Sequence, residues 1–250
     1  MEIEAKWKVA DADTLRRLCN LDHLACYDVL PGRTHEVHDT YLDSPDRRML
    51  AAGFACRRRE QGDAVRITLK GLGGSDGAVH RRAEHEMLLP TGTPDDPARC
   101  ASRHLYGEAA QCASRHLYGE AALWPAGPVR EQVLECIADA PLVPLFKLDQ
   151  TRTQRTVMRD GLPVAMLSLD HVLVAAGGRR DEYWELEIEL LPAGSEGDLA
   201  AMVAALRRDG GLTPEPRSKF ERGLALLDAG ARWTQGASFS RGRDPSLRSG

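Results

Sequence analysis

The sequence predicts a mainly β protein of the α+β class, built on an antiparallel sheet that closes or nearly closes on itself. Roughly eight or nine short strand-like segments alternate with turn residues. The chain opens with Glu-Ile-Glu-Ala-Lys at residues 2–6, which places Glu2, Glu4 and Lys6 on one face of a strand. Residues 185–190 read Glu-Leu-Glu-Ile-Glu-Leu and again place acids on one face. Because neighbouring acids repel one another, both strands indicate a bound cation, and in particular a divalent metal.

Turn residues divide the chain into these segments. A helix over residues 14–21, capped by Asp11 or Asp13, follows the first strand. Strands are predicted over 38–42, 53–60, 64–70 and 81–89, separated by turns at 43–46 and 61–63 and by the glycine-rich 71–77. A helix over 128–139 precedes strands over 151–159, 163–169, 171–175 and 183–191. Helices over 198–208 and 220–227 complete the predicted elements.

Composition restricts the class of protein. The 250 residues carry 33 Lys and Arg against 37 Asp and Glu, a formal charge of −4, which does not favour a nucleic-acid partner. Six scattered cysteines without a Cys-x-x-Cys pair are typical of free thiols in a reducing compartment. The N-terminus has no signal-peptide pattern, and the most apolar stretch, 162–176, is too short to span a bilayer. We therefore expect a cytoplasmic protein with no membrane partner.

The chain is expected to form one domain over residues 1–228, with a variable insert over 91–127 and a disordered tail over 229–250. Residues 100–110 recur unchanged at 112–122, which indicates a recent duplication rather than a structural repeat. The duplication also creates a set that resembles zinc ligands, namely Cys100, His104, Cys112 and His116. Chance copying of one Cys and one His explains this set more simply than a zinc site.

Cations also fall at alternate positions in the strands between the two acidic ends. Examples are Arg57 with Arg59, then Lys70 and Arg82, and later Arg152. Each alone is more often a residue that faces solvent. If all of these faces point inward, the interior holds many fixed charges of both signs, which is costly unless the interior is wet and binds a charged ligand. A polyphosphate with a divalent cation fits best, because Arg and Lys bind phosphate oxygens while carboxylates hold the metal.

Taken together, these residues resemble the CYTH superfamily, the triphosphate tunnel metalloenzymes. Its N-terminal Glu-x-Glu-x-Lys signature is matched by Glu2, Glu4 and Lys6. Further matches follow in family order at 41–46, 53–59, 68–70, 82–86, 169–170, 185–189 and 218–223. The best likeness, through Leu145-Phe146 and Arg217-Ser218-Lys219, is to the bacterial inorganic triphosphatases of the family.

The resemblance implies an eight-stranded antiparallel barrel that forms a tunnel, with helices packed outside. It implies a Mg²⁺ or Mn²⁺ site formed by Glu2, Glu4, Asp170, Glu185 and Glu187. It also implies that the triphosphate is bound by Lys6, Arg57, Arg59, Lys70, Arg82, Arg152 and Lys219, with Glu2, Glu4 and Lys6 as the catalytic signature. Glu84 and Glu86 would orient cations. The roles of Glu189 and Arg155 are left open, because strand register decides the first and parity opposes the second.

The activity implied is metal-dependent hydrolysis of inorganic triphosphate to pyrophosphate and phosphate. Three alternatives stay open: a class IV adenylyl cyclase, a thiamine or nucleoside triphosphatase, and a polyphosphate-binding module without catalysis. A small-molecule triphosphate is the expected partner. The oligomeric state is left open, with a homodimer as one option.

Overall fold

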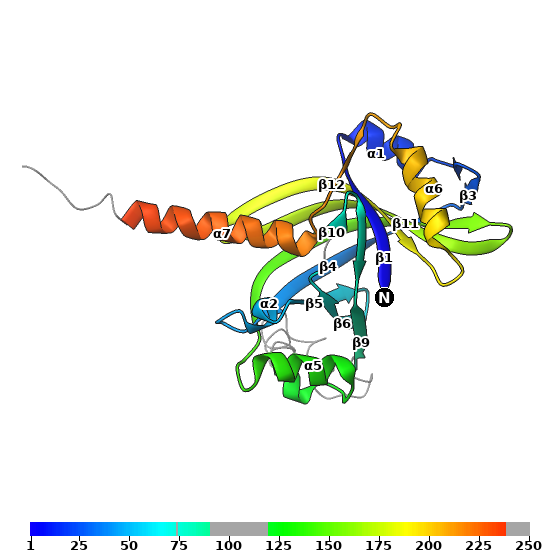
Figure 1. Cartoon of the computed structure of the whole chain (residues 1–250). Coiled ribbons are helices and arrows are strands. Elements are labelled where there is room, and N and C mark those ends of the chain that lie inside the picture. Colours follow the sequence, from blue (N-terminus) through cyan, green and yellow to red (C-terminus); the bar gives the residue numbers. More distant parts are fainter. Residues whose placement is uncertain (74, 91–119, 239–250) are drawn as a thin grey trace, which may run out of the picture.

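The computed structural model describes residues 1–73, 75–90 and 120–238, so the duplicated Cys and His residues at 100–116, judged more simply explained by chance copying than by zinc, lie outside the described residues. One antiparallel sheet dominates the structure, and its long strands curve around a central space (Figure 1). Its strands before the insert are β1 (Glu2–Val9), β2 (His23–Leu24), β3 (Tyr27–Val29), β4 (Arg33–Asp43), β5 (Phe54–Gln61), β6 (Ala64–Gly71), β7 (Ser75–Asp76), β8 (Val79–Arg82) and β9 (Glu84–Leu89). After the insert come β10 (Val143–Arg159), β11 (Leu162–Ala176), β12 (Arg179–Leu190) and β13 (Leu212–Pro214).

The sheet returns to its own starting edge. Its hydrogen-bonded order is β7-β8-β1-β12-β11-β10-β4-β5-β6-β9, and only Ala83 separates β8 from β9 along the chain. Because β8 pairs with β1 while β9 pairs with β6, this interrupted strand joins the two ends of the sheet. Counted as one strand, it gives the eight-strand circuit that the sequence predicts. The structure differs from the predicted barrel in two ways. The strand that closes it is broken at Ala83, and the sheet contains thirteen strands among the described residues.

The helices are α1 (Ala12–Cys19), α2 (Arg48–Ala51), the 3₁₀ helix η1 (Ala121–Leu123), α5 (Pro128–Ile137), α6 (Glu196–Leu206) and α7 (Lys219–Ser238). The helices before α7 lie outside the sheet at two ends, whereas the first turn of α7 packs into one end of the interior (Figure 1). Helix α1 begins at Ala12, two residues before the predicted start at Thr14, and its cap is Asp11, one of the two predicted caps, which accepts a hydrogen bond from the Thr14 amide. Helix α6 begins at a capping box in which the Ser195 hydroxyl accepts from the Asp198 amide and the Asp198 carboxylate accepts from the Ser195 amide.

Several predicted bounds are wrong in an informative way. Strand β10 begins at Val143, eight residues before the predicted start at Thr151, and β4 begins at Arg33 rather than His38. The two strands predicted over 163–175 form the single strand β11. Helix α7 continues to Ser238, ten residues into the expected tail, whereas residues 239–250 lie outside the described range. The missed start of β4, residues 33–36, is polar, so apolar alternation did not reveal it. The start of β10 was missed although Phe146 and Leu148 alternate on its inward face.

Apolar clusters hold the helices to the sheet and leave one region of the interior polar. Helices α1 and α6 pack on the outer face of β1, β11 and β12 through residues such as Trp7, Leu186 and Met202. Helices α2 and α5 pack on β5, β6 and β9. A third cluster, with Phe146 and Phe220 at its centre, joins the first turn of α7 to β4, β10, β11 and β12. Phe146 lies on the same face of β10 as Arg152, so this third cluster fills one end of the interior, and the charged cavity lies beside it.

Candidate active site

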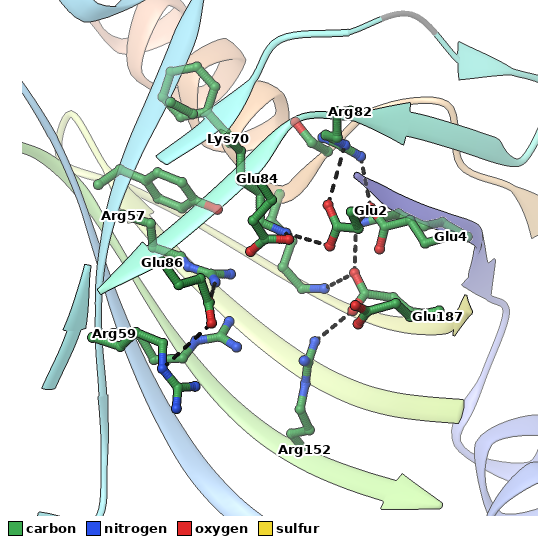
Figure 2. Close-up of a pocket in the computed structure, with 18 of the residues that line it drawn as sticks. Glu2, Glu4, Arg57, Arg59, Lys70, Arg82, Glu84, Glu86, Arg152 and Glu187 are labelled. Atoms are coloured by element: carbon green, nitrogen blue, oxygen red, sulfur yellow. Dashed lines mark hydrogen bonds and ion pairs between the residues drawn. The ribbon is translucent and has the colours of Figure 1, made fainter. Parts of the chain in front are cut away.

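A cavity of about 470 Å³ occupies the inside of the curved sheet, a size ordinary for a small-molecule site. Eight Lys or Arg side chains and six Glu side chains line it. Figure 2 shows the labelled members of this set on different strands around the cavity, with Arg57 and Arg59 on the side opposite Glu4 and Glu187. The cations are Lys6, Arg57, Arg59, Arg66, Lys70, Arg82, Arg152 and Lys219, and the acids are Glu2, Glu4, Glu84, Glu86, Glu187 and Glu189. The cavity therefore fits a ligand that carries charges of both signs.

On the first wall, the two N-terminal carboxylates are held by cations of neighbouring strands. Lys70 Nζ donates to Glu2 Oε1 at 2.6 Å, and Arg82 Nη2 donates to Glu4 Oε1 at 2.9 Å. Both acids are buried, with 8 % and 3 % of the surface of Glu2 and Glu4 exposed. Charge-assisted hydrogen bonds of this kind fix the carboxylates on the wall.

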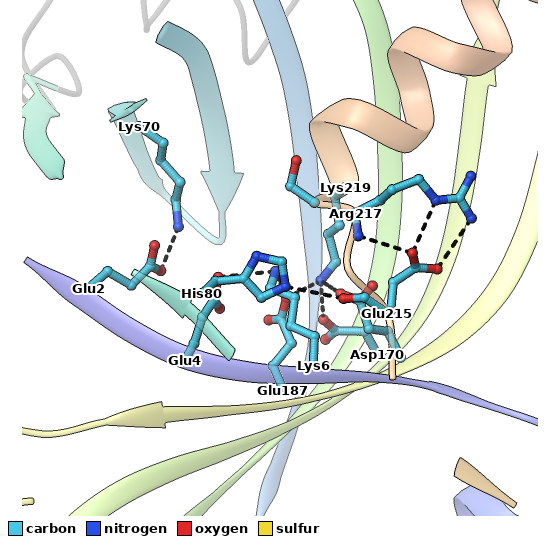
Figure 3. A network of polar contacts seen from close by, with 12 residues as sticks. Glu2, Glu4, Lys6, Lys70, His80, Asp170, Glu187, Glu215, Arg217 and Lys219 are labelled. Atoms are coloured by element: carbon cyan, nitrogen blue, oxygen red, sulfur yellow. Dashed lines mark hydrogen bonds and ion pairs between the residues drawn. The ribbon is translucent and has the colours of Figure 1, made fainter. Parts of the chain in front are cut away.

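The deepest part of the cavity is a network of cations and acids centred on Glu187 (Figure 3). Glu187 accepts hydrogen bonds from Lys6 Nζ and Lys219 Nζ at 2.6 Å each and from Arg152 Nη2 at 2.6 Å. Arg152 also forms a two-point contact with Asp170, with Nε–Oδ1 and Nη2–Oδ2 distances of 2.7 and 2.5 Å. Cross-strand register brings these groups together, since Lys6 lies opposite Glu187 and Arg152 opposite Asp170.

Three carboxylates in this network lie close enough to share one cation. Single oxygens of Asp170, Glu185 and Glu187 are all within 4.8 Å of one another. Burial, together with the neighbouring Glu187, raises the pKa of Glu185 to about 7, although Lys219 and Lys6 oppose the rise. Burial opposes ionisation of Glu187 as well, but Lys219, Lys6 and Arg152 hold its pKa well below the usual value. The Glu185 carboxyl group is therefore partly protonated at physiological pH, while Glu187 is ionised.

The five predicted metal ligands do not form a single group among the described residues. Asp170, Glu185 and Glu187 gather, while Glu2 and Glu4 lie on the adjoining strand. The role of Glu189 was left open because it depends on the strand register. The structure places Glu189 opposite Glu4, on the cavity wall. Burial and the nearby Glu2 raise the pKa of Glu189 to about 7. The acids of β1 and β12 thus form a continuous acidic wall with the three-carboxylate group at its deep end.

This three-carboxylate group has the donors of a site for a hard divalent cation, but Lys219 Nζ contacts an oxygen of each carboxylate and would have to move aside for the ion. Its donors are all carboxylate oxygens, which suit Mg²⁺ and Mn²⁺. Glu185 Oε2 is buried and has no hydrogen-bond partner among the described residues, and the same is true of Glu2 Oε2 on the neighbouring strand. Buried carboxylate oxygens usually have a partner, so these two are available to a cation or to water.

The opposite wall carries the guanidinium groups of Arg57 and Arg59, which hydrogen bonds to neighbouring side chains hold in place. Arg57 Nη2 donates to Thr68 Oγ1 at 3.1 Å, and the Thr68 hydroxyl in turn donates to Glu86 Oε1 at 2.9 Å. Arg59 forms a two-point contact with the buried Asp39, at 2.8 Å for each hydrogen bond. Guanidinium groups fixed in this way present their remaining N–H groups to the cavity, where they can bind phosphate oxygens.

A short loop before α7 carries Lys219 into the cavity. Glu215, itself buried, accepts hydrogen bonds from the amide and Nε of Arg217, both at 3.1 Å, and from Arg222 Nη1 at 2.8 Å (Figure 3). Ser218 caps the helix through its contacts with Glu221. These contacts fix the loop on both sides of Lys219 and so set the place of its ammonium group.

All seven predicted substrate-binding cations line this one cavity. Arg155, whose position in the strand alternation is opposite to that of Arg152, does not line the cavity. Its guanidinium group donates to the backbone carbonyls of residues 18, 19, 29 and 30. Arg66, which shares the parity of Lys70, also lines the cavity, although it was not among the predicted binding residues. Asp39 and Gln150 were not predicted as site residues either. Asp39 lies inside the predicted strand over 38–42, but no alternation of charges there marks it as a site residue. Gln150 lies one residue before the predicted strand over 151–159.

A CYTH domain model matches residues 1–224. The chain belongs to the CYTH family. Among solved structures, it is similar to HpAC1 from Hippeastrum, a candidate adenylyl cyclase with a dominant triphosphatase activity, at 18% identity and a TM-score of 0.61, covering 92% of this chain and 96% of that one. It is also similar to a candidate adenylate cyclase from Bacillus halodurans, at 19% identity and a TM-score of 0.57, covering 89% and 96%.

A third similar structure is the PH1819 protein from Pyrococcus horikoshii, at 19% identity and a TM-score of 0.50, covering 90% of this chain and 99% of that one. At these identities the likeness shows a shared fold. Within the described ranges, no helix has the length and apolar character that a membrane crossing requires.

Proposed function

We propose that this CYTH protein hydrolyses inorganic triphosphate to pyrophosphate and phosphate, with Mg²⁺ or Mn²⁺ as cofactor. The observation that carries the proposal is the paired charge of one cavity: the guanidinium groups of Arg57 and Arg59 on one wall and a three-carboxylate group at the deep end of the other. A linear triphosphate with a divalent cation matches both walls, because its oxygens accept from guanidinium groups while its metal binds carboxylates.

Different side chains of the cavity would bind the substrate and stabilise the charge that develops during hydrolysis. Arg57 and Arg59 bind and orient phosphate oxygens, because their guanidinium groups are already held by buried acceptors. Lys6, Lys219 and Arg152 surround Glu187 and can stabilise negative charge on the leaving pyrophosphate. When bound by the carboxylates of the acidic wall, a divalent cation would supply Lewis-acid stabilisation and activate water. Glu185 can hold a proton in the absence of the cation and release it on binding.

An adenylyl cyclase on this barrel is the second candidate, supported by the likeness to structures described as candidate cyclases. It would bind the triphosphate through the same groups and use a ribose hydroxyl in place of water. Hydrolysis of thiamine or nucleoside triphosphates needs the same contacts as well. Binding of polyphosphate without catalysis is less well supported, since it does not require the acidic wall.

Product formation from a panel of substrates separates these functions. Tripolyphosphate, ATP, thiamine triphosphate and pyrophosphate are incubated with the full chain in Mg²⁺, in Mn²⁺ and in EDTA, while phosphate and cyclic AMP are measured. The proposal expects rapid release from tripolyphosphate that EDTA abolishes. Cyclic AMP from ATP, without release from tripolyphosphate, would support the cyclase instead. Tight binding of tripolyphosphate without any product would support the binding module.

A further inference from the structure

Asp39 is a buried carboxylate at the border between the cationic cavity and the apolar cluster around Phe146. Only 1 % of its surface is exposed, and it lies directly opposite Arg59 on the neighbouring strand. Its Oδ1 accepts from Arg59 Nε at 2.8 Å, and its Oδ2 accepts from Arg59 Nη2 at 2.8 Å. Gln150 Nε2, on the other side, donates to the same Oδ2 at 2.8 Å. One carboxylate thus joins β4, β5 and β10.

Packing alone does not explain this charge. The inward neighbours of Asp39 on its own strand are Val37 and Tyr41, and the residue opposite it on β10 is Leu148, all of them buried. An apolar side chain at position 39 would continue that cluster, and replacing a buried ion pair by packed apolar groups is often neutral or stabilising. Gln150 also leaves its buried Oε1 without a hydrogen-bond partner among the described residues. A charge kept at such a cost suggests a role in the site.

The two-point contact fixes the orientation of Arg59 toward the cavity. It uses Nε and Nη2, and within the described part of the chain no hydrogen bond uses Nη1. Arg59 lines the cavity, so its remaining N–H groups are the ones offered to a ligand. Arg57 lies next to the same carboxylate, with Nη1 at 3.9 Å from Asp39 Oδ2. A long side chain ordered in advance loses less conformational freedom when the ligand binds.

We propose that Asp39 is a positioning residue, which acts through Arg59 to hold the phosphate-binding guanidinium in its binding orientation. The inference rests on the proposed function in so far as the ligand is a triphosphate. It goes beyond that function by placing part of the binding free energy in a residue that does not line the cavity.

The sign of one measurement distinguishes positioning from a general charge effect. Burial disfavours the ionised form of Asp39, yet Arg57 and Arg59 hold its pKa well below the usual value, so the residue is an anion at neutral pH. If its charge acted only at a distance, Asp39→Asn would make the cavity more positive and strengthen triphosphate binding. If Asp39 positions Arg59, the same change weakens binding, because an amide cannot accept the two-point contact with both oxygens.

Calorimetry of tripolyphosphate binding in EDTA measures this effect without turnover. We expect Asp39→Asn to weaken binding at least tenfold, and to raise KM more than it lowers kcat when Mg²⁺ is present. In an Arg59→Ala background the same change should cost less than twofold, since the group it positions is gone. Unchanged or tighter binding in Asp39→Asn, or an equal loss in both backgrounds, would overturn the inference.

Two further variants address folding. Asp198→Asn is the matched control, because it removes a buried carboxylate that contacts Tyr27 and Arg159 away from the cavity. It should leave tripolyphosphate binding within twofold. If Asp39→Asn does not fold, Gln150→Leu removes only the second donor to Asp39. This variant should weaken binding two- to threefold, and an unchanged affinity would count against the inference.

Hydrogen exchange of the Arg59 Nε–H, followed by NMR in ligand-free protein, is independent of the substrate. Positioning predicts slow exchange in the wild type and at least tenfold faster exchange in Asp39→Asn or Gln150→Leu. An exchange rate that neither variant changes would overturn the inference. Failure of the proposed function is seen separately, as wild-type protein that neither binds nor cleaves tripolyphosphate.

Discussion

Lys6 and Glu187 face each other across the β1–β12 pair, and Lys6 Nζ donates to Glu187 Oε1 at 2.6 Å. This contact joins the two charged strands that lie at opposite ends of the sequence. Because Lys6 Nζ is also 3.3 Å from Glu4 Oε1, the N-terminal signature and the acidic strand form one wall rather than two sites. Neutralising an acid on this wall should therefore affect function before it affects the fold.

Glu4→Gln tests this expectation. The amide can still accept from Arg82, which contacts Glu4 Oε1 at 2.9 Å, but it no longer supplies negative charge for a cation. We expect kcat for tripolyphosphate to fall at least about 100-fold, which corresponds to ~3 kcal/mol of transition-state stabilisation. Glu196→Gln is the control, since Glu196 pairs with Arg81 on the exposed outer face. A circular-dichroism spectrum showing that Glu4→Gln unfolds the protein would defeat the assignment.

Metal binding should release a proton at slightly acidic pH. The pKa of Glu185 is raised to about 7 by burial and by Glu187, so below that pH a cation must displace a proton from it. Mn²⁺ affinity should therefore rise with pH through 6 to 7 and level off above 8. Calorimetry at pH 6 in two buffers of different ionisation enthalpy should show about one proton released per metal. Glu185→Gln should remove this release, and Glu189→Gln should retain it; the reverse pattern would assign the proton to Glu189.

Gly223 lies where α7 packs against Phe146 of β10. A Cβ at this position would lie 2.1 Å from Phe146 Cε2, in a ring that also packs on Tyr41. Although alanine favours a helix over glycine by about 1 kcal/mol, overpacking should dominate and Gly223→Ala should lower the free energy of unfolding by roughly 1–3 kcal/mol. Gly210→Ala, where a Cβ meets nothing within 4 Å, is the control. Equal urea midpoints for the two variants would show that α7 does not depend on this contact.

The capping box of α6 should contribute to stability and leave activity alone. Ser195 Oγ accepts from the Asp198 amide at 3.3 Å and donates to its carboxylate at 2.7 Å. Ser195→Ala should cost about 1 kcal/mol in urea unfolding. Because the helix packs on the outer face of the sheet, kcat/KM for tripolyphosphate should stay within twofold of wild type. A larger loss of activity would mean that α6 influences the cavity.

Alternation along single strands was enough to predict much of the site. Glu2, Glu4 and Lys6 do share a cavity wall, because every second side chain of β1 lies on the same side. Alternation cannot show which strand lies opposite which. The contact of Glu4 with Arg82, rather than with the three-carboxylate group, depends on the β1–β8 register and on the reach of an arginine side chain.

There is also a physical reason why Asp39 and Gln150 were not predicted from the sequence. Asp39 and Gln150 are polar side chains on inward faces, and the contacts of Asp39 with Arg59 and Gln150 depend on which strands lie side by side. The break at Ala83 was likewise not predicted, since it arises where one strand leaves β1 and joins β6. Ring closure and long-range ion pairs are properties of the whole sheet.

The central claim is most directly tested by ³¹P NMR of tripolyphosphate incubated with the full chain, with Mg²⁺, with Mn²⁺ and with EDTA. The account predicts that the tripolyphosphate signals are replaced by equal amounts of pyrophosphate and phosphate when metal is present. It predicts no change in EDTA. Persistence of tripolyphosphate with both metals, under conditions where calorimetry shows it bound, would contradict a triphosphatase.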